Sequence, residues 1–153
     1  FYSAWFFVPQ PITTTSYWVL FKFRSRSPES EVGDVDLWDV DVTTSTSGQM
    51  VFQLYGHTLS EQPGPSTLAV PPGRWFQIEA YLAPRTDATG QLTVWVDGTM
   101  LHQVSQSATV PSPYLEWSVG GITETIEPSG ARVAIDDAAI TTERLGPDFP
   151  VFE

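Results

Sequence analysis

The chain has 153 residues, and its 7 lysines and arginines against 18 aspartates and glutamates give a formal net charge of -11. This length suffices for one hydrophobic core and is short for two, while so acidic a surface excludes nucleic acid and anionic membranes as partners. Cysteine is absent, which rules out disulfide bonds and thiol chemistry, and no apolar stretch approaches the roughly 20 residues that span a bilayer.

Apolar and polar residues alternate with a period of two along most of the chain. This pattern predicts β-strands, and no helical i, i+3, i+4 spacing persists for three turns. Turns rich in Gly, Pro, Ser and Asp separate the strands at short intervals. In chain order, the expected strands lie in residues 1–9, 17–24, 36–42, 50–57, 74–82, 91–96, 99–104, 115–119 and 131–141.

The strand expected at residues 17–24 carries a row of cations in an otherwise acidic chain. Regular alternation places Tyr17, Val19, Phe21 and Phe23 on one face, and Trp18, Leu20, Lys22 and Arg24 on the other. The row continues to Arg26, two residues further on. An anionic glycan would meet local positive charge there, although each cation could equally pair with an acid on an adjacent strand.

The next two strands carry acidic and polar side chains on one face. In residues 36–42, Trp38, Val40 and Val42 alternate with Leu37, Asp39 and Asp41. In residues 50–57, Gln53, Tyr55 and His57 lie opposite Phe52 and Leu54. The face that holds Gln53, Tyr55 and His57 is the most suggestive candidate site in the sequence.

The strand expected at residues 74–82 also divides into two faces. Phe76, Ile78, Ala80 and Leu82 are expected to face the core, and Trp75, Gln77, Glu79 and Tyr81 to face away from it. Residues 91–104 then predict a hairpin, because Asp97-Gly98 is a pair favoured in type I′ turns. That turn predicts Trp95 opposite Met100 and Val94 opposite Leu101.

About nine or ten short strands with such turns predict an all-β fold, an antiparallel two-sheet β-sandwich or jelly roll. We expect one domain over residues 1–146, followed by a C-terminal tail over residues 147–153. The chain opens on a strand-like segment without a charged leader, so it is expected to be a mature or excised domain. Its acidic, lysine-poor and Ser/Thr-rich composition favours an extracellular, secreted protein, which could belong to a larger multidomain chain.

Four segments together resemble a known superfamily: "PPGRWFQIEAYL", "GQLTVWVDGTML", "LEWSVGGI" and "ARVAIDDAAITTERLG". They are similar to the concanavalin A-like, laminin-G-like jelly rolls, near the heparin-lyase- and alginate-lyase-type polysaccharide lyases and carbohydrate-binding modules. The resemblance extends from about Tyr17 to Gly146. It implies a sugar ligand on a concave sheet, although this fold carries lectins, binding modules, hydrolases and lyases alike.

In alginate-lyase-type enzymes the resemblance implies an Arg-bearing strand, a Gln-x-His strand and a late Tyr-rich strand. Arg24 and the pair Gln53 and His57 match the first two, although Tyr55 occupies the histidine position of Gln-x-His and the late motif is missing. β-Elimination on a uronate needs a group that neutralises the carboxylate, a base for the C5 proton and an acid for the leaving oxygen. Arg24 or Gln53, His57 and Tyr55 are the candidates for these roles.

A second candidate site consists of outward-facing aromatic and amide side chains. Trp75, Tyr81 and Trp95 offer flat surfaces for sugar rings, and Gln77 and Glu79 could bind vicinal hydroxyl groups. Packing under a loop would explain the same tryptophans without a ligand. A glycosidase is disfavoured, because no pair of carboxylates at the spacing of a retaining enzyme is apparent.

None of these candidate sites requires a cofactor, although a structural calcium ion is possible. The resemblance implies that an aspartate on the last strand helps to bind it, and Asp136 is the candidate. Two histidines without cysteine make a zinc site improbable.

Three functions therefore remain open. The first is a lectin-like domain that binds a polysaccharide or oligosaccharide on the concave face of one sheet, through Lys22, Arg24, Gln53, Tyr55, His57, Trp75, Gln77, Glu79, Tyr81 and Trp95. The second is a small polysaccharide lyase, and the third is a non-catalytic extracellular adhesion or structural domain. The first requires these side chains, which come from several strands, to converge on one surface.

Overall fold

The computed structural model describes residues 1–25, 35–57, 62–107, 115–123 and 125–148. Within them the chain forms nine strands and no helix that could cross a membrane. The strands are β1 (Tyr2–Phe7), β2 (Trp18–Ser25), β3 (Val35–Thr44), β4 (Met50–Gly56), β5 (Trp75–Ala83), β6 (Gly90–Val96), β7 (Thr99–Ser107), β8 (Leu115–Thr123) and β9 (Ala134–Ile140).

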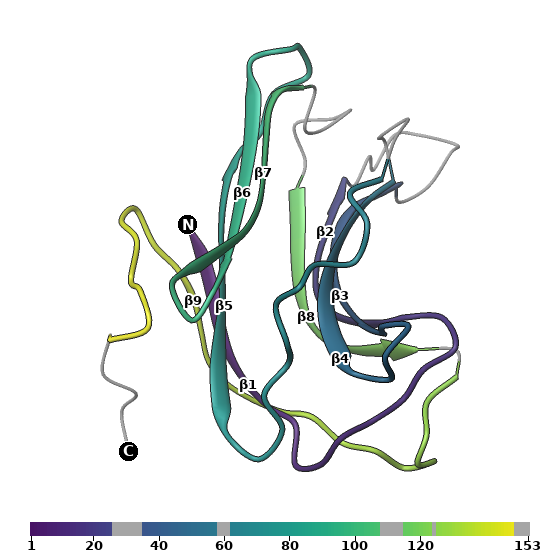
Figure 1. Cartoon of the computed structure of the whole chain (residues 1–153). Coiled ribbons are helices and arrows are strands. Elements are labelled where there is room, and N and C mark those ends of the chain that lie inside the picture. Colours follow the sequence, from purple (N-terminus) through teal and green to yellow (C-terminus); the bar gives the residue numbers. More distant parts are fainter. Residues whose placement is uncertain (26–34, 58–61, 108–114, 124, 149–153) are drawn as a thin grey trace.

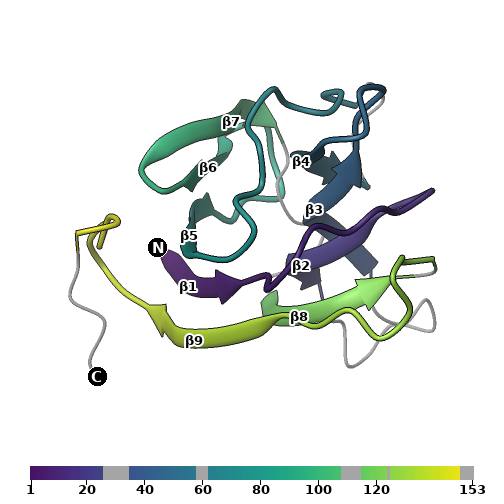
Figure 2. The ribbon, with the colours of Figure 1, turned by 60° about the horizontal axis from the view of Figure 1, so that its bottom comes forward.

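Two antiparallel sheets form the fold, as the alternation predicts. One sheet has five strands in the order β7-β6-β5-β1-β9, and the other has four in the order β4-β3-β2-β8. Figures 1 and 2 show them as two facing layers. The predicted all-β sandwich is therefore confirmed.

The core fills the space between the sheets with aromatic and aliphatic side chains. Phe76 of β5 stacks on Phe6 of β1, with 5.9 Å between ring centroids, and meets Phe52 of β4 edge-on at 5.4 Å. Phe52 belongs to the four-stranded sheet, so this cluster joins the two layers. All three rings are fully buried, and each such ring contributes about 1.5–3 kcal/mol to folding.

Register shifts in β2 and β3 break the regular alternation. The pairing of β2 with both neighbours shifts between Val19 and Phe21, so that Leu20 and Phe21 both face the core. The pairing of β2 with β3 shifts again beside Leu37, and Leu37 and Trp38 also both face the core. Such bulges add a residue to one strand and bend it.

The bulges correct two of the predicted faces. Trp18 and Leu20 lie in the core and not on the face of Lys22 and Arg24, while Val19 lies with the cations and not with Phe21 and Phe23. Leu37 is likewise in the core, whereas Asp39 and Asp41 line a pocket on the outer face. The alternation predicted for Gln53, Tyr55 and His57 is confirmed, because Phe52 and Leu54, on the opposite face, are buried.

The hairpin between β6 and β7 has the predicted turn. Asp97 and Gly98 both have positive φ, 46° and 75°, as a type I′ turn requires. Trp95 pairs with Met100 as predicted, but Val94 pairs with His102 instead of Leu101. The reason is a register shift between Val94 and Trp95.

Candidate functional site

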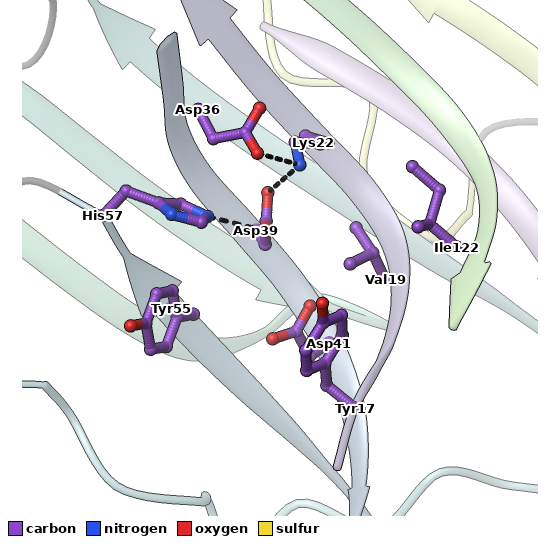
Figure 3. A pocket seen from close by; sticks show the side chains of 9 residues that line it. All are labelled: Tyr17, Val19, Lys22, Asp36, Asp39, Asp41, Tyr55, His57 and Ile122. Carbon is purple, nitrogen blue, oxygen red and sulfur yellow. Dashed lines mark hydrogen bonds and ion pairs between the residues drawn. The ribbon is translucent and has the colours of Figure 1, made fainter. Parts of the chain in front are cut away.

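The outer face of the four-stranded sheet is hollow. In Figure 1, strands β2, β3, β4 and β8 bow toward the five-stranded sheet, so the inside of the bend faces outward. A pocket of about 300 Å³ lies on this face. Figure 3 shows its lining, which consists of Tyr17, Val19, Lys22, Asp36, Asp39, Asp41, Tyr55, His57 and Ile122.

Both cations described in the β2 row are held by carboxylates of β3. Lys22 Nζ lies 2.7 Å from Asp36 Oδ2 and 3.6 Å from Asp39 Oδ1, and Arg24 Nε lies 2.6 Å from Asp36 Oδ1. Burial acts to raise the pKa of Asp36, but hydrogen bonds from Lys22 and Arg24 outweigh it and lower that pKa. Cross-strand pairing therefore accounts for these two cations, and Arg26 lies outside the described residues.

Asp39 and His57 form the second polar contact of the pocket. His57 Nε2 lies 2.9 Å from Asp39 Oδ2, which fixes the orientation of the imidazole. The ring of Tyr55 meets that imidazole edge-on, with 4.9 Å between centroids. Burial raises the pKa of Asp39, although the hydrogen bond with His57 and the charge of Lys22 act to lower it.

Asp41 is the unusual carboxyl group of the site. It is only 5% exposed, and its Oδ1 atom is buried without a hydrogen-bond partner in the described structure. Burial, with a further contribution from the charge of Asp39, raises its pKa to about 7. Asp41 is therefore partly protonated at neutral pH, which allows it to donate or to accept a hydrogen bond there.

A second pocket, of about 290 Å³, continues the hollow across β2 to β8. It shares Val19, Lys22 and Ile122 with the first pocket, and Ser118 and Gly120 also line it. Strands lie about 4.8 Å apart, so a ligand reaching from β4 to β8 would cross about 14 Å. The two pockets together thus form a groove, here called the outer groove, suited to an elongated ligand.

The predicted site residues divide between the two sheets. Lys22, Arg24, Gln53, Tyr55 and His57 belong to the four-stranded sheet and its edge, and Trp75, Gln77, Glu79, Tyr81 and Trp95 belong to the five-stranded sheet. The expectation of one surface that combines both groups is therefore wrong. Arg24 and Gln53 share the outer groove's sheet, but neither lines the pocket of Figure 3.

The outer face of the five-stranded sheet is partly covered by the end of the chain. Arg144 lies over the ring of Trp95, 4.2 Å from its centroid, and its Nε donates to Glu79 Oε2 at 2.7 Å. The backbone N–H of Leu145 donates to Glu79 Oε1, also at 2.7 Å. Glu79 is consequently only 1% exposed.

Two further residues of this predicted platform already have aromatic or polar partners. Gln77 is 1% exposed and donates to Ser3 Oγ at 2.9 Å, while the ring of Tyr81 lies 5.1 Å from that of Phe1. Trp75 remains 40% exposed beside Phe7. Packing by the chain's own residues thus explains most of this second candidate site.

Asp136, the predicted calcium ligand, lies on the exposed edge strand β9. Its Oδ1 accepts a hydrogen bond from the backbone N–H of Asp137 at 2.9 Å. In the part of the chain that the structure describes, no group of three His, Asp or Glu residues is arranged to hold a metal ion. Calcium binding at Asp136 stays a prediction.

Sequence reasoning did not assign Tyr17, Asp36 or Asp41 to the site. Asp41 could have been found from the alternation, once the face of Tyr55 and His57 was chosen and β3 was placed beside β4. Tyr17 could not, because the alternation places it with Phe21 and Phe23, and only the bulge at Leu20 brings it to the face of Lys22. Asp36 could not be found either, because the bulge at Leu37 brings it to the face of Asp39.

Two solved structures are similar to this fold. An endo-β-1,4-glucuronan lyase from the fungus Trichoderma reesei has a TM-score of 0.64 and 16% identity, over 90% of this chain and 65% of that one. An alginate lyase in complex with an alginate trisaccharide has a TM-score of 0.57 and 12% identity, over 90% of this chain and 68% of that one. No family model and no curated protein matches the chain. It shares the jelly-roll fold of these two enzymes, of whose length it spans about two thirds.

Proposed function

We propose that the chain binds a glycan in the outer groove. The observation that carries the proposal is the lining of the pocket, where the rings of Tyr17, Tyr55 and His57 adjoin buried carboxyl groups. Sugars present C–H faces that pack on aromatic rings, and hydroxyl groups that bond to carboxylates, so this lining suits them. The jelly-roll likeness to two polysaccharide lyases supports the same ligand class.

A glycan ligand also supports the expected location outside the cell, where polysaccharides are abundant. The elongated groove favours a chain of several sugars over a single one, because its two pockets adjoin each other. The ion pairs of Lys22 and Arg24 with Asp36 serve in this proposal to hold the groove's floor rather than to attract an anion.

Calorimetric titration with oligosaccharides tests the proposal. The panel contains neutral, amine-bearing and uronate-bearing chains of equal length, and at least one is expected to bind. Tyr55→Ala is expected to lower its affinity about tenfold or more, because it removes an aromatic contact from the pocket. Trp75→Ala is the matched control, because Trp75 is 40% exposed and Tyr55 37%, yet Trp75 lies on the other sheet. Binding of no chain, or equal losses in both variants, would contradict the proposal.

A second candidate function is β-elimination on a uronate chain in the same groove. It is favoured by the contact between Asp39 and His57 Nε2, which leaves Nδ1 as the nitrogen able to accept a proton. In this reaction one of the two side chains, His57 or Tyr55, removes the proton at C5, the bond between C4 and the leaving oxygen breaks, and the other side chain donates a proton to that oxygen. His57 or Tyr55 is the proposed base.

The unsaturated product of elimination absorbs ultraviolet light, and this absorbance provides the test. Alginate, glucuronan and glycosaminoglycans are the substrates to compare. A signal that His57→Ala abolishes, without loss of glycan binding, would support the lyase. Binding without any absorbance change would leave the chain a binding domain.

A further inference from the structure

Building on the proposed glycan site, we infer that Asp41 selects a sugar carrying a protonated amine, and that the ligand is therefore an amino-sugar chain. Three features of the outer groove support this ligand class: the unpartnered carboxyl group of Asp41, the charges that face it, and the aromatic rings that line the same pocket.

Asp41 is the carboxyl group of the pocket whose partner is missing within the described chain. Asp36 is bound by Lys22 and Arg24, and Asp39 by His57, at distances between 2.6 and 2.9 Å. Asp39 and Asp41 are equally buried, at 5% exposure, and the Oδ1 atom of each lacks a hydrogen-bond donor. Asp39 nevertheless contacts His57 through Oδ2 and has Lys22 Nζ 3.6 Å from Oδ1, whereas no such contact is found for Asp41 among the described residues. A buried carboxyl oxygen without a donor is costly, and a ligand that supplies one removes this cost.

The charges facing Asp41 favour a cationic donor over an anionic one. Lys22 is the cation among the pocket's lining residues, and its ammonium contacts Asp36 and Asp39. Asp39 lies two residues before Asp41 on the same face of β3, and its charge acts to keep Asp41 protonated. An ammonium group would reverse that effect, whereas a uronate carboxylate would add a further negative charge.

Aromatic rings beside Asp41 suit an organic ammonium group. Tyr17 and Tyr55 line the same pocket as Asp41, and Figure 3 shows all three side chains there. Ammonium groups are attracted to the faces of aromatic rings as well as to carboxylates. A metal ion is the less suitable cation, because no group of three ligating side chains in the described ranges is arranged to hold one.

The first test compares three tetrasaccharides with the unmodified protein, at a pH where the amine is protonated. They consist of glucosamine, N-acetylglucosamine and glucuronic acid. The glucosamine chain is expected to bind about tenfold or more tightly than the N-acetylated one, in which a neutral acetamide replaces each ammonium group. Equal or tighter binding of the acetylated or the uronate chain would overturn the inference while leaving the proposed glycan site intact. If none of the three binds, this inference fails, and the wider panel decides the proposed function.

The second test uses the same replacement, aspartate by asparagine, at two positions. Asp41→Asn is expected to abolish the preference for the glucosamine chain, whereas Asp87→Asn, at an exposed residue of the turn between β5 and β6, should preserve it. A preference that survives in Asp41→Asn would overturn the inference. Because the first test needs no variant, the inference stays falsifiable even if Asp41→Asn fails to fold.

Proton release on binding provides an independent measurement. An ammonium beside Asp41 favours the ionised carboxylate, so binding near pH 7 should release protons, measurable by calorimetry in buffers of different ionisation enthalpy. The other titratable groups that line the pocket are Tyr17, Lys22, Asp36, Asp39, Tyr55 and His57. Asp41→Asn should remove the part of the release that comes from Asp41, and an unchanged release would contradict the inference.

Discussion

Arg144 lies over the indole ring of Trp95 while its Nε donates a 2.7 Å hydrogen bond to the buried Glu79. This single residue of the chain's end thus covers one aromatic side chain and neutralises one acid of the five-stranded sheet. This contact explains why side chains that the sequence pattern predicts to be available to a ligand are instead packed against the chain's own residues.

Arg144→Ala is accordingly expected to lower the free energy of unfolding by about 2–4 kcal/mol, because it leaves the buried charge of Glu79 without its cation. Hydrogen bonds from Leu145 and Gly146 to Glu79 remain and limit the loss. Arg74→Ala is the matched control: Arg74 pairs with Asp97, but its side chain is 63% exposed, and such surface pairs contribute about 1 kcal/mol or less. Urea denaturation of both variants checks this prediction, and equal losses would contradict it.

The two adjacent glycines of β8 are expected to differ sharply in their tolerance of alanine. A Cβ atom at Gly121 would lie 2.7 Å from Trp18 Nε1, whereas one at Gly120 would meet nothing within 4 Å. Gly121→Ala should therefore lower the free energy of unfolding by about 1–3 kcal/mol through overpacking, and Gly120→Ala should change it by less than about 0.5 kcal/mol. Thermal unfolding measures both, and a similar cost for the two would show that the assigned faces are wrong.

A larger side chain at Gly120 should shorten the outer groove. Gly120→Leu places apolar volume in the second pocket without strain on the backbone, because Gly120 does not have a positive φ. Under the proposed function, affinity for a long oligosaccharide should fall about tenfold, to that of a disaccharide that occupies the first pocket alone. Titration with chains of increasing length tests this, and an unchanged length dependence would place the ligand elsewhere.

Asp41 should make the protein less stable as the pH rises. Its pKa is about 7 in the folded protein against an ordinary value of 3.8, so the folded state holds an extra proton between about pH 4 and pH 7. Stability is therefore lost across this window and stays low above it. Asp41→Asn should remove the slope and stabilise the protein above pH 7, by at most about 4 kcal/mol.

Asp36, on the same strand, should change the pH dependence of stability in the opposite direction. Its pKa is lowered, so the stability it contributes is present above its unfolded pKa and is lost as the pH falls through its folded pKa. Asp36→Asn should thus destabilise the protein at neutral pH and flatten the acid side of the profile. Urea midpoints measured from pH 3 to pH 9 separate the two effects, and profiles of the same sign for both variants would contradict the assignment.

Much of the fold could be predicted from the sequence, because alternation is a local property. Phe52 and Leu54 alternate with Gln53 and Tyr55 in the sequence as they do in the strand. The bulges were missed for the same reason. Two successive apolar residues, such as Leu20 and Phe21, are compatible with a regular strand as well as with a bulge, so the sequence pattern does not reveal the inserted residue.

The site was less predictable, because it depends on which strands become neighbours. Tyr55 and Trp75 both follow an outward-facing pattern, yet they lie on opposite sheets. The burial of Glu79 depends on Arg144, which lies 65 residues further along the chain. No local pattern encodes either fact, since both arise from contacts between distant segments.

The bend of the four-stranded sheet has a consequence for how such a groove could arise. Leu20 and Leu37 are each an extra core residue, and without them Lys22, Arg24, Asp39 and Asp41 would still point outward. Deleting both leucines should straighten the strands and flatten the groove while leaving these four outward-facing residues in place. Two single-codon insertions of residues whose side chains pack in the core would then suffice to turn a flat jelly-roll surface into a concave one.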